Sequence, residues 1–522
     1  MLIVLVQLII CSSDYVIFST SPAFSLIKKR PLRGPFFIYR LAVPSLTMFW
    51  RQSLFLLFIA FFSCKPPGYE RNFATEPEVE FDLEAIRKRG SLVALLDNNS
   101  ISYFIYKGQP MGYEYELLKQ LAKSLKVDLK IRLVTGIEQA IDLLNKGEGD
   151  VLAFPLTITA ERKQYVTFTN PHFDTHQVLV QKKPANWRMQ APEVLEKKLI
   201  RQPEQLAGQH VYVMKGSAFR DRLLELNTQL AAPILIKEDS ATAETESLIQ
   251  KVATGEIKFT VTDEVIANIN TLYYSNLDIN TVLSEPQQIA WAVRTNSPEL
   301  NTEINTWLAK TKKSGVFKVI YDKYFKSSRL ALARIKDDYS SLTGGQLSPF
   351  DEQLKKGAEQ IGWDWRLVAS VVYQESNFNP RVKSWAGAIG LMQIMPETGE
   401  YFGASNLWDP SQNINVGIRF LKFLDKHWAK TVADPEERMK FVLASYNVGL
   451  SHVIDAQKLT RKYGKDPTLW EENVEYYLLQ KRDPKYFRDP VAVVGYCRCD
   501  GPVRYVKEVL QRYDEYRLRI AA

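Results

Sequence analysis

The sequence predicts a multidomain protein, in which an α/β domain over 80–328 precedes a mainly α-helical domain over 349–522. Short apolar strands alternate with amphipathic helices in the first region. In the second region, apolar residues recur at i, i+3, i+4 and i+7. The chain has 522 residues, 46% of them hydrophobic, so it is long enough to fill two or more hydrophobic cores.

The α/β region has the pattern of βα units around a mainly parallel sheet. Strands are predicted at 91–96, 129–134 and 151–154, and helices at 112–125 and 137–146. Any doubly wound α/β enzyme would show the same alternation, but the region has no glycine-rich phosphate loop, which disfavours a nucleotide-dependent enzyme. The segment 329–348, which contains a Gly-Gly pair and a run of Asp and Ser residues, is predicted to be the interdomain linker.

Glu375 is the candidate catalytic residue of the helical region. A helix is predicted over 349–376, and one face of it carries Val368, Val371, Val372 and Glu375. A carboxyl group on an apolar face is desolvated, which favours its protonated form. A carboxylic acid that stays protonated near neutral pH can serve as a general acid. The alternative is an acid that pairs with an arginine or caps a loop.

Glu375 belongs to the first of three short motifs whose order and spacing are informative. They read Gln-Glu-Ser-x-Phe-x-Pro at 374–380, Gly-Leu-Met-Gln at 390–393 and Ala-Ser-Tyr-Asn-Val-Gly at 444–449. Over 345–520 the chain resembles the Slt-type lytic transglycosylases, which have a goose-type lysozyme-like helical fold. The resemblance implies that fold for the second domain.

The resemblance also implies a chemistry for Glu375. In that family the glutamic acid protonates the glycosidic oxygen between N-acetylmuramic acid and N-acetylglucosamine in peptidoglycan. It then takes the proton of the muramyl 6-hydroxyl, which attacks the anomeric carbon, so that a 1,6-anhydro sugar forms and no water is consumed. Tyr446 is expected beside Glu375. The residues that carry over as substrate-binding are Ser384, Met392, Gln393, Tyr446, Asn447 and Tyr505.

This mechanism needs no second catalytic acid, although ordinary glycosidases use two carboxyl groups. Glu397 is the alternative candidate for such an acid, but it follows Pro396 at a predicted helix start, where an acid suits the helix dipole. The segment 501–506 keeps Tyr505 but lacks the glutamate that many family members carry there. The segment 495–501 resembles the membrane-bound F branch of the family.

The α/β region carries a second set of motifs. They read Tyr-x-x-Tyr-x-Gly-x-Pro-x-Gly-Tyr-Glu from 103, Gly-x-Gly-Asp-Val from 147, Thr-x-Thr-x-Glu-Arg from 157 and Val-x-Phe-Thr-x-Pro from 166. These motifs resemble the family 3 periplasmic solute-binding proteins, which bind polar amino acids between two lobes. The resemblance implies a two-lobed domain that binds a small amino-acid-like or muropeptide ligand.

The same resemblance implies which residues bind that ligand. Arg162 would hold the α-carboxylate, which a planar guanidinium does well, and Asp263 would pair with the α-ammonium group. Thr157 and Ser217, the latter in a turn before a predicted helix, would supply hydroxyl and backbone N–H donors. Tyr103 is the fifth candidate. For Arg162 the alternative is an ordinary surface ion pair.

Residues 48–64 look like a bacterial lipoprotein signal. Arg51 precedes an apolar run at 54–62, which is followed by Ser63 and Cys64. The run is too short for a comfortable membrane span. Cys64 is therefore predicted to be lipidated; the alternative is an incidental cysteine after an apolar run.

The predicted organisation before the α/β domain is a leader over 1–63 and a tether over 64–79. A further apolar run opens the chain, so Met48 is the simplest true start; the alternative is that residues 1–47 form a membrane anchor of their own. The predicted location is the periplasmic face of the outer membrane, with the inner membrane as the alternative.

The net charge and the cysteine and histidine content of the chain limit which binding partners and metal ions are expected. The net charge of +8, from 67 basic and 59 acidic residues, is modest and does not favour nucleic acid. A mildly basic surface suits an anionic wall polymer or a membrane surface. With 4 cysteines and 5 histidines, no metal site and no cofactor are expected. The spacing of Cys497 and Cys499 is unfavourable for an unstrained disulfide within one strand.

Together these resemblances imply a lipid-anchored lytic transglycosylase that acts on peptidoglycan and carries a regulatory solute-binding domain. One alternative is a binding lipoprotein whose second domain grips the wall without cleaving it. Glu375 with Gln393 and the Tyr446-Asn447 pair disfavours that alternative. Another is a hydrolase of the muramidase type, which would add water to the same bond.

Overall fold

The computed structural model describes residues 77, 79–97, 99–239, 245–327, 337–342 and 345–522. Residues 71–522 belong to one compact unit. The predicted leader, Cys64 and parts of the predicted linker lie outside the described residues. In the part of the chain that is described, no helix is long and apolar enough to cross a bilayer.

The first sheet of the α/β region contains the three strands predicted from the sequence. Its order is β4-β1-β5-β13-β6, with β7 paired to β13. The strands are β1 (Ser91–Leu96), β4 (Asp128–Leu133), β5 (Val151–Thr157), β6 (Thr167–Phe168), β7 (Phe173–Thr175) and β13 (Gln287–Val293). β1 runs parallel to β4 and β5, whereas β13 is antiparallel to β5. The predicted helices are also present, as α3 (Tyr113–Leu125) and α4 (Ile137–Asn145).

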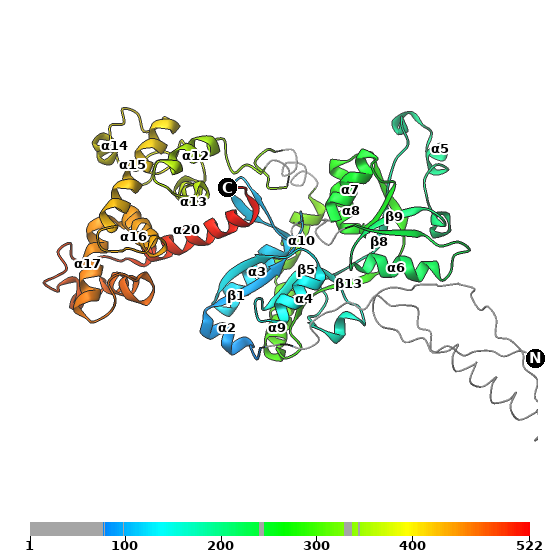
Figure 1. The fold of residues 1–522 in the computed structure, drawn as a ribbon, viewed down its shortest axis with the longest axis horizontal. Helices are drawn as coiled ribbons and strands as arrows, with labels where there is room; N and C mark the ends of the chain where they lie inside the picture. Colours follow the sequence, from blue (N-terminus) through cyan, green and yellow to red (C-terminus); the bar gives the residue numbers. More distant parts are fainter. Residues whose placement is uncertain (1–76, 78, 98, 240–244, 328–336, 343–344) are drawn as a thin grey trace, which may run out of the picture. The chain divides into compact units, whose positions relative to one another are not determined.

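The second sheet has the order β10-β9-β11-β8-β12. Its strands are β8 (Gln177–Lys182), β9 (His210–Met214), β10 (Leu235–Asp239), β11 (Phe259–Asp263) and β12 (Leu277–Val282). β9, β10 and β11 are parallel. α6 (Ala218–Asn227) and α7 (Thr245–Thr254) lie between them in the sequence, and α8 (Glu264–Tyr273) follows β11. The α/β region therefore has two lobes, each built on its own sheet, which are drawn in blue to green in Figure 1.

The chain passes between the two lobes twice, from β7 to β8 and from β12 to β13. The two crossing segments are joined by hydrogen bonds, since the Gln177 backbone N–H donates to the Ser284 hydroxyl at 2.9 Å and His176 Nδ1 lies 3.1 Å from the Ser284 carbonyl oxygen. After β13, α9 (Pro298–Lys313) and α10 (Val316–Tyr321) pack on α3 of the first lobe.

The helical region begins with two helices, not with the single helix predicted over 349–376. α12 covers Asp351–Glu359, and α13 covers Trp365–Ser376. Between them Gly362 has a left-handed φ of 68°, and the Asp364 side chain accepts a hydrogen bond from the Arg366 N–H to cap α13. The prediction of one helix was wrong because the apolar periodicity continues across a turn that ends one helix and caps the next.

The remaining helices often begin with an Asp-Pro pair. Asp409, Asp434 and Asp483 each cap a helix whose first residue is proline. The aspartate accepts free N–H groups of the first turn, and proline has no N–H to leave unpaired. The helices are α14 (Pro396–Tyr401), α15 (Pro410–Trp428), α16 (Pro435–Val448), α17 (Leu450–Lys462), α18 (Glu475–Gln480), α19 (Pro484–Phe487) and α20 (Asp500–Arg519). Helices α13, α15, α16 and α20 contribute to one apolar core.

Cys497 and Cys499 are joined by a disulfide, with their Cα atoms 5.3 Å apart. The sequence argument against this pairing was wrong because it assumed that both residues lie in a strand. They lie in an irregular segment that leads into α20, where the backbone turns. Both side chains are buried against the helical core, so the disulfide fixes the start of α20.

Candidate active site and ligand cleft

Glu375 lies in the last turn of α13 and is partly buried against α20. The Tyr505 hydroxyl of α20 donates a hydrogen bond of 2.7 Å to Glu375 Oε1. Burial raises the pKa of Glu375 to about 7, although the bond from Tyr505 lowers it by a smaller amount. A substantial fraction of this carboxyl group is thus protonated at neutral pH, which is what a general acid requires.

Tyr446 lies near Glu375 but bonds elsewhere. Its hydroxyl donates to the Met392 carbonyl oxygen at 2.6 Å. Burial raises its pKa well above the usual value, and the charge of Glu375 raises it further. The sequence thus placed Tyr446 near the acid but did not predict that Tyr505 is the residue bonded to it. The Tyr505-Val506 pair of the family pattern was the available signal.

The loop after α13 is held by its own hydrogen bonds. The Ser376 hydroxyl donates to the Leu391 carbonyl at 2.7 Å, which ties the end of the helix to the Gly-Leu-Met-Gln motif. Gln393 has a left-handed φ of 48°, and its Nε2 donates to the carbonyl oxygens of Val382 and Gly390. The Gln393 amide nitrogen therefore fixes the loop in the described structure.

The Met392 side chain is fully buried in the helical core, so it is not accessible to substrate, contrary to what the resemblance implied. Its sulfur packs against Gly417, where an added Cβ atom would collide with it. Ser384 is partly exposed in a hairpin and accepts the Ala388 N–H at 3.0 Å. Asn447 is exposed near the end of α16.

Close packing requires glycine at position 390. Its φ is 79°, and a Cβ there would lie 2.7 Å from the Leu407 carbonyl oxygen and collide with Asn413. The Asn413 side chain connects three parts of the loop, because it accepts the Met392 N–H and donates to the carbonyls of Ile389 and Leu407. Asn413 belongs to α15, so this helix holds the segment before Gln393 in place.

Glu397, the alternative acid, is exposed in the first turn of α14. That turn begins with Pro396, as predicted from the sequence. Its position suits the positive end of the helix dipole and needs no catalytic explanation.

Helix α20 holds the end of α13 through Gln374, the residue before Glu375. Gln374 Nε2 donates to Glu508 at 2.7 Å, and its Oε1 accepts from Arg512 Nη1 at 2.7 Å. With Tyr505, three residues of one helix therefore position the last turn that carries the candidate acid.

The other half of α20 contacts the first lobe of the α/β region. The Tyr516 hydroxyl donates to the Gly108 carbonyl at 2.7 Å, and Arg519 donates to the Tyr103 carbonyl at 2.8 Å. Gly108 lies in the turn between β2 (Phe104–Tyr106) and β3 (Gln109–Met111), where a Cβ would come within 2.9 Å of Tyr373. The turn therefore packs on α13, the helix whose last turn carries Glu375.

Tyr103 belongs to this junction and not to the ligand cleft, contrary to the prediction. Its side chain is fully buried and meets Tyr115 edge to face, with the ring centres 5.4 Å apart. Nearby, the Tyr115 hydroxyl donates to Glu515 of α20 at 3.3 Å, and burial raises the pKa of Glu515 to about 7.

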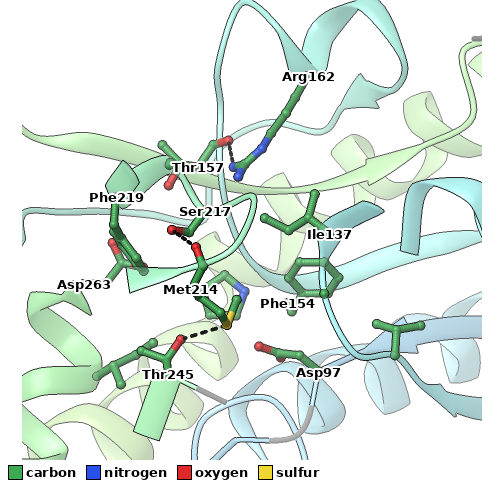
Figure 2. Close-up of a pocket in the computed structure, with 15 residues that line it drawn as sticks. Asp97, Ile137, Phe154, Thr157, Arg162, Met214, Ser217, Phe219, Thr245 and Asp263 are labelled. Atoms are coloured by element: carbon green, nitrogen blue, oxygen red, sulfur yellow. Dashed lines mark hydrogen bonds between the residues drawn. The ribbon is translucent and has the colours of Figure 1, made fainter. Parts of the chain in front are cut away.

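A cleft lies between the two lobes and contains the other four predicted residues, Thr157, Arg162, Ser217 and Asp263 (Figure 2). Its lining is completed by Asp97, Val134, Gly136, Ile137, Phe154, Pro155, Met214, Ala218, Phe219, Thr245 and Ile266. The four predicted residues come from ends of strands and starts of helices in both lobes, so folding is what brings them together.

Arg162 and Asp263 are the charged residues predicted to bind the ligand. Arg162 is 2% exposed in a 3₁₀ turn after β5, and its Nη1 donates to the Thr157 carbonyl at 2.9 Å. Asp263 is 3% exposed where β11 meets α8. Burial raises the pKa of Asp263 to about 7, and the charge of Arg162 lowers it by less.

Ser217 precedes α6 and donates its hydroxyl to the Met214 carbonyl at 2.7 Å. Ser217 and Ala218, at the start of α6, both line the cleft. Asp97 was not among the predicted residues. It directly follows β1, and ligands of α/β sheets bind at such carboxyl ends of parallel strands, which is the signal that could have identified it.

Two protein families match this chain. Bacterial extracellular solute-binding proteins, family 3, match residues 92–327, and the transglycosylase SLT domain matches residues 352–469. The fold therefore belongs to a class in which a two-lobed solute-binding domain is joined to a helical transglycosylase-type domain.

Curated relatives match over most of this chain. The chain is 35% identical over 431 residues to membrane-bound lytic murein transglycosylase F of Desulfosudis oleivorans, which covers 82% of this chain and 90% of the relative. It is 30% identical over 437 residues to the protein of that name from Pseudomonas fluorescens, covering 83% and 86%. The chain belongs to the membrane-bound lytic murein transglycosylase F family. Among solved structures, a mutant of ArgBP from T. maritima is 27% identical, with a TM-score of 0.40 over 47% of this chain and 99% of that one.

Proposed function

We propose that this protein is a lytic transglycosylase that cleaves the β-1,4 bond between N-acetylmuramic acid and N-acetylglucosamine in peptidoglycan. The observation that carries the proposal is Glu375, a partly buried carboxyl group with a pKa of about 7 that is bonded to Tyr505. Such a group can donate a proton and accept one at the same pH.

In the proposed reaction Glu375 gives its proton to the glycosidic oxygen as the bond from the muramyl anomeric carbon to that oxygen breaks. The muramyl 6-hydroxyl then forms a bond to the anomeric carbon and loses its proton to Glu375. The enzyme returns to its starting state, and no water enters the product. Because the substrate supplies the nucleophile, a second carboxyl group is unnecessary, in contrast to ordinary glycosidases.

We expect soluble products that end in 1,6-anhydromuramic acid when the protein digests purified peptidoglycan. Mass spectrometry checks this, because each anhydro product is lighter by one water than its hydrolysed counterpart. Borohydride treatment gives a second check, since it reduces the free ends left by a hydrolase and leaves anhydro ends unchanged. Reducible ends would instead indicate the muramidase alternative, and wall binding without soluble products would indicate the binding-only alternative.

We further propose that the cleft binds an amino-acid-like or muropeptide ligand and that this ligand regulates catalysis. Support comes from the charged cleft residues Arg162 and Asp263 and from α20, which touches both Glu375 and the first lobe. A ligand shifts the balance between open and closed lobes only by binding one of them better. The domains that we propose span 80–328 and 349–522, joined by a linker at 329–348.

We also propose that a lipid on Cys64 anchors the protein at the periplasmic face of the outer membrane. The support is the lipoprotein-like segment 48–64. The Cys64→Ala variant is expected in the soluble fraction, whereas the parent chain is expected with membranes. Mass analysis of the mature parent chain is the direct test, and an N-terminus other than an acylated Cys64 contradicts the proposal.

A further inference from the structure

A continuous row of aromatic rings crosses the helical region. It starts at Tyr446, whose ring centre lies 5.3 Å from that of Phe420. The Phe420 ring is 6.0 Å from the Phe402 ring. Phe402 then meets two further rings, Tyr401 at 4.9 Å and Phe423 at 6.3 Å. Aromatic rings at these separations are in contact, so the row connects α16 to α15 and to the end of α14 (Figure 1).

The outer end of the row is exposed to solvent. Tyr401 is 76% exposed and Phe423 is 45% exposed, whereas the other three rings are partly buried. Phe420 and Phe423 are three residues apart and share one face of α15, while Leu421 and Leu424 of the same helix are buried in the core. Large apolar side chains in water cost free energy, and a contiguous patch of them marks a binding surface.

The backbone that carries the outer rings is held in place. Arg419 Nη1 of α15 donates to the Phe402 carbonyl at 3.0 Å. The Ala404 N–H donates to the Gly399 carbonyl at 2.8 Å, which closes the turn after α14. A Cβ on Gly399 would lie 2.8 Å from the Leu407 side chain, so α14 packs closely at this point. Because the rings are already ordered, little conformational entropy is lost when a ligand binds to them.

The inner end of the row is at the candidate active site. Tyr446 lies close enough to Glu375 to feel its charge, and its hydroxyl is held by the Met392 carbonyl oxygen at 2.6 Å. A glycan strand that places one glycosidic bond at Glu375 must continue beyond it, because every sugar is joined to the next. The row is thus a surface that leads away from the acid, continuous with the site where the polymer is held.

Aromatic rings suit the chemistry of a β-1,4-linked glycan. A pyranose ring presents a face of C–H groups, which can stack on the face of an aromatic ring and displace water from it. The hydroxyl and N-acetyl groups project from the edge of the sugar and stay hydrated. A line of rings, rather than a broad patch, matches a linear chain of sugars.

We infer that the row of Tyr446, Phe420, Phe402, Tyr401 and Phe423 is an extended glycan-binding surface, on which sugars distant from the scissile bond stack, and that it makes the enzyme prefer long strands over short ones. The inference rests on the proposed function, in which Glu375 cleaves the glycan of peptidoglycan. Sugars remote from the reacting bond are held equally in the ground state and the transition state, so these contacts lower KM and leave kcat unchanged.

The test compares two peptidoglycan glycans as substrates of the full chain. One is a tetrasaccharide with a single scissile bond, and the other is a preparation of long strands; anhydro products are counted per scissile bond by mass spectrometry. The parent chain is expected to have the lower KM for long strands. In Tyr401→Ala and in Phe423→Ala this KM should rise about twofold to tenfold, the size of one aromatic contact, with kcat unchanged. The kinetics on the tetrasaccharide should stay the same.

Two matched variants separate the role of the rings from general effects of substitution. Tyr401→Phe keeps the ring and should retain the preference for long strands. Tyr476→Ala removes a tyrosine that is 39% exposed on α18, outside the row, and should change neither substrate. Thermal unfolding checks that each variant is folded, which is expected because the substituted rings are the exposed ones.

The possible failures are distinguishable. A parent chain that cleaves both glycans with equal KM, or a preference that survives in both Tyr401→Ala and Phe423→Ala, removes the extended surface and leaves the proposed cleavage intact. An equal loss on the tetrasaccharide also contradicts the inference, because the rings would then act at the reacting bond or on the fold. Failure of the parent chain to cleave either glycan would instead remove the proposed function.

Discussion

Replacing Glu375 with glutamine is expected to lower the release of anhydromuropeptides at least about 10²–10⁴-fold, the range that general acid catalysis alone supplies. The amide keeps the shape of the carboxyl group and can still accept the 2.7 Å bond from Tyr505, but it has no proton to transfer. Because one residue serves both proton transfers, both are lost together. Wall binding should persist, and product release is measured by mass spectrometry.

The matched control is Glu397→Gln, which removes the exposed acid in the first turn of α14. Its activity should stay close to that of the parent chain. Folding of Glu375→Gln is checked by thermal unfolding at pH 4 and pH 8. Burial raises the Glu375 pKa from 4.5 to about 7 in the folded state, so ionisation costs stability as the pH rises above 4.5. Glutamine removes this cost, and the variant should gain stability relative to the parent at pH 8. Undiminished anhydromuropeptide release by Glu375→Gln would reject Glu375 as the acid.

Local patterns were sufficient for much of the fold. Strand alternation predicted β1, β4 and β5, and the Asp-Pro pairs show why several helices start where they do. The break between α12 and α13 was missed because apolar residues continue at helical spacing through it. A left-handed Gly362 and the Asp364 cap decide that break, and both are local features that a search for periodicity overlooks.

The sites were predicted less evenly, because a short motif identifies residues without giving the direction of their side chains. Met392 lies in the correct loop, but its side chain fills the core. Tyr103 lies in the correct motif, but it packs at the contact with α20. In that contact, Tyr516 bonds Gly108 and Arg519 bonds Tyr103, across sequence separations of 408 and 416 residues. Such long-range contacts have no signal in local sequence.

If a cleft ligand regulates catalysis as proposed, helix α20 is the element that would connect the first lobe to Glu375. Its residues 505–512 bond Glu375 and Gln374, and Tyr516 and Arg519 bond the hairpin turn and the carbonyl of Tyr103 in the first lobe. Coupling of this kind requires two arrangements that the ligand binds with different affinity. A shift of the first lobe relative to α20 would therefore reach the last turn of α13 through a single helix.

Arg162→Ala is expected to abolish measurable ligand binding at the cleft. Arg162 is 2% exposed, so its loss leaves the ligand carboxylate buried without a counter-charge. Removing one member of a buried charged pair costs about 2–5 kcal/mol, which corresponds to about a 30-fold to several-thousandfold loss of affinity. Calorimetry measures the loss, and Arg188→Ala, an exposed arginine on the second lobe, is the matched control.

Catalysis without ligand should be unchanged in Arg162→Ala, because Glu375 and the residues that hold it belong to the helical region and to α20. Activity is therefore measured in four conditions, with the parent chain and Arg162→Ala, each with and without a wall muropeptide digest or a polar amino acid. If the ligand regulates catalysis, only the parent chain responds to it. If the ligand binds the parent tightly and all four activities are equal, the domain serves as a tether or scavenger, because a ligand that leaves activity unchanged has no differential affinity for the active arrangement.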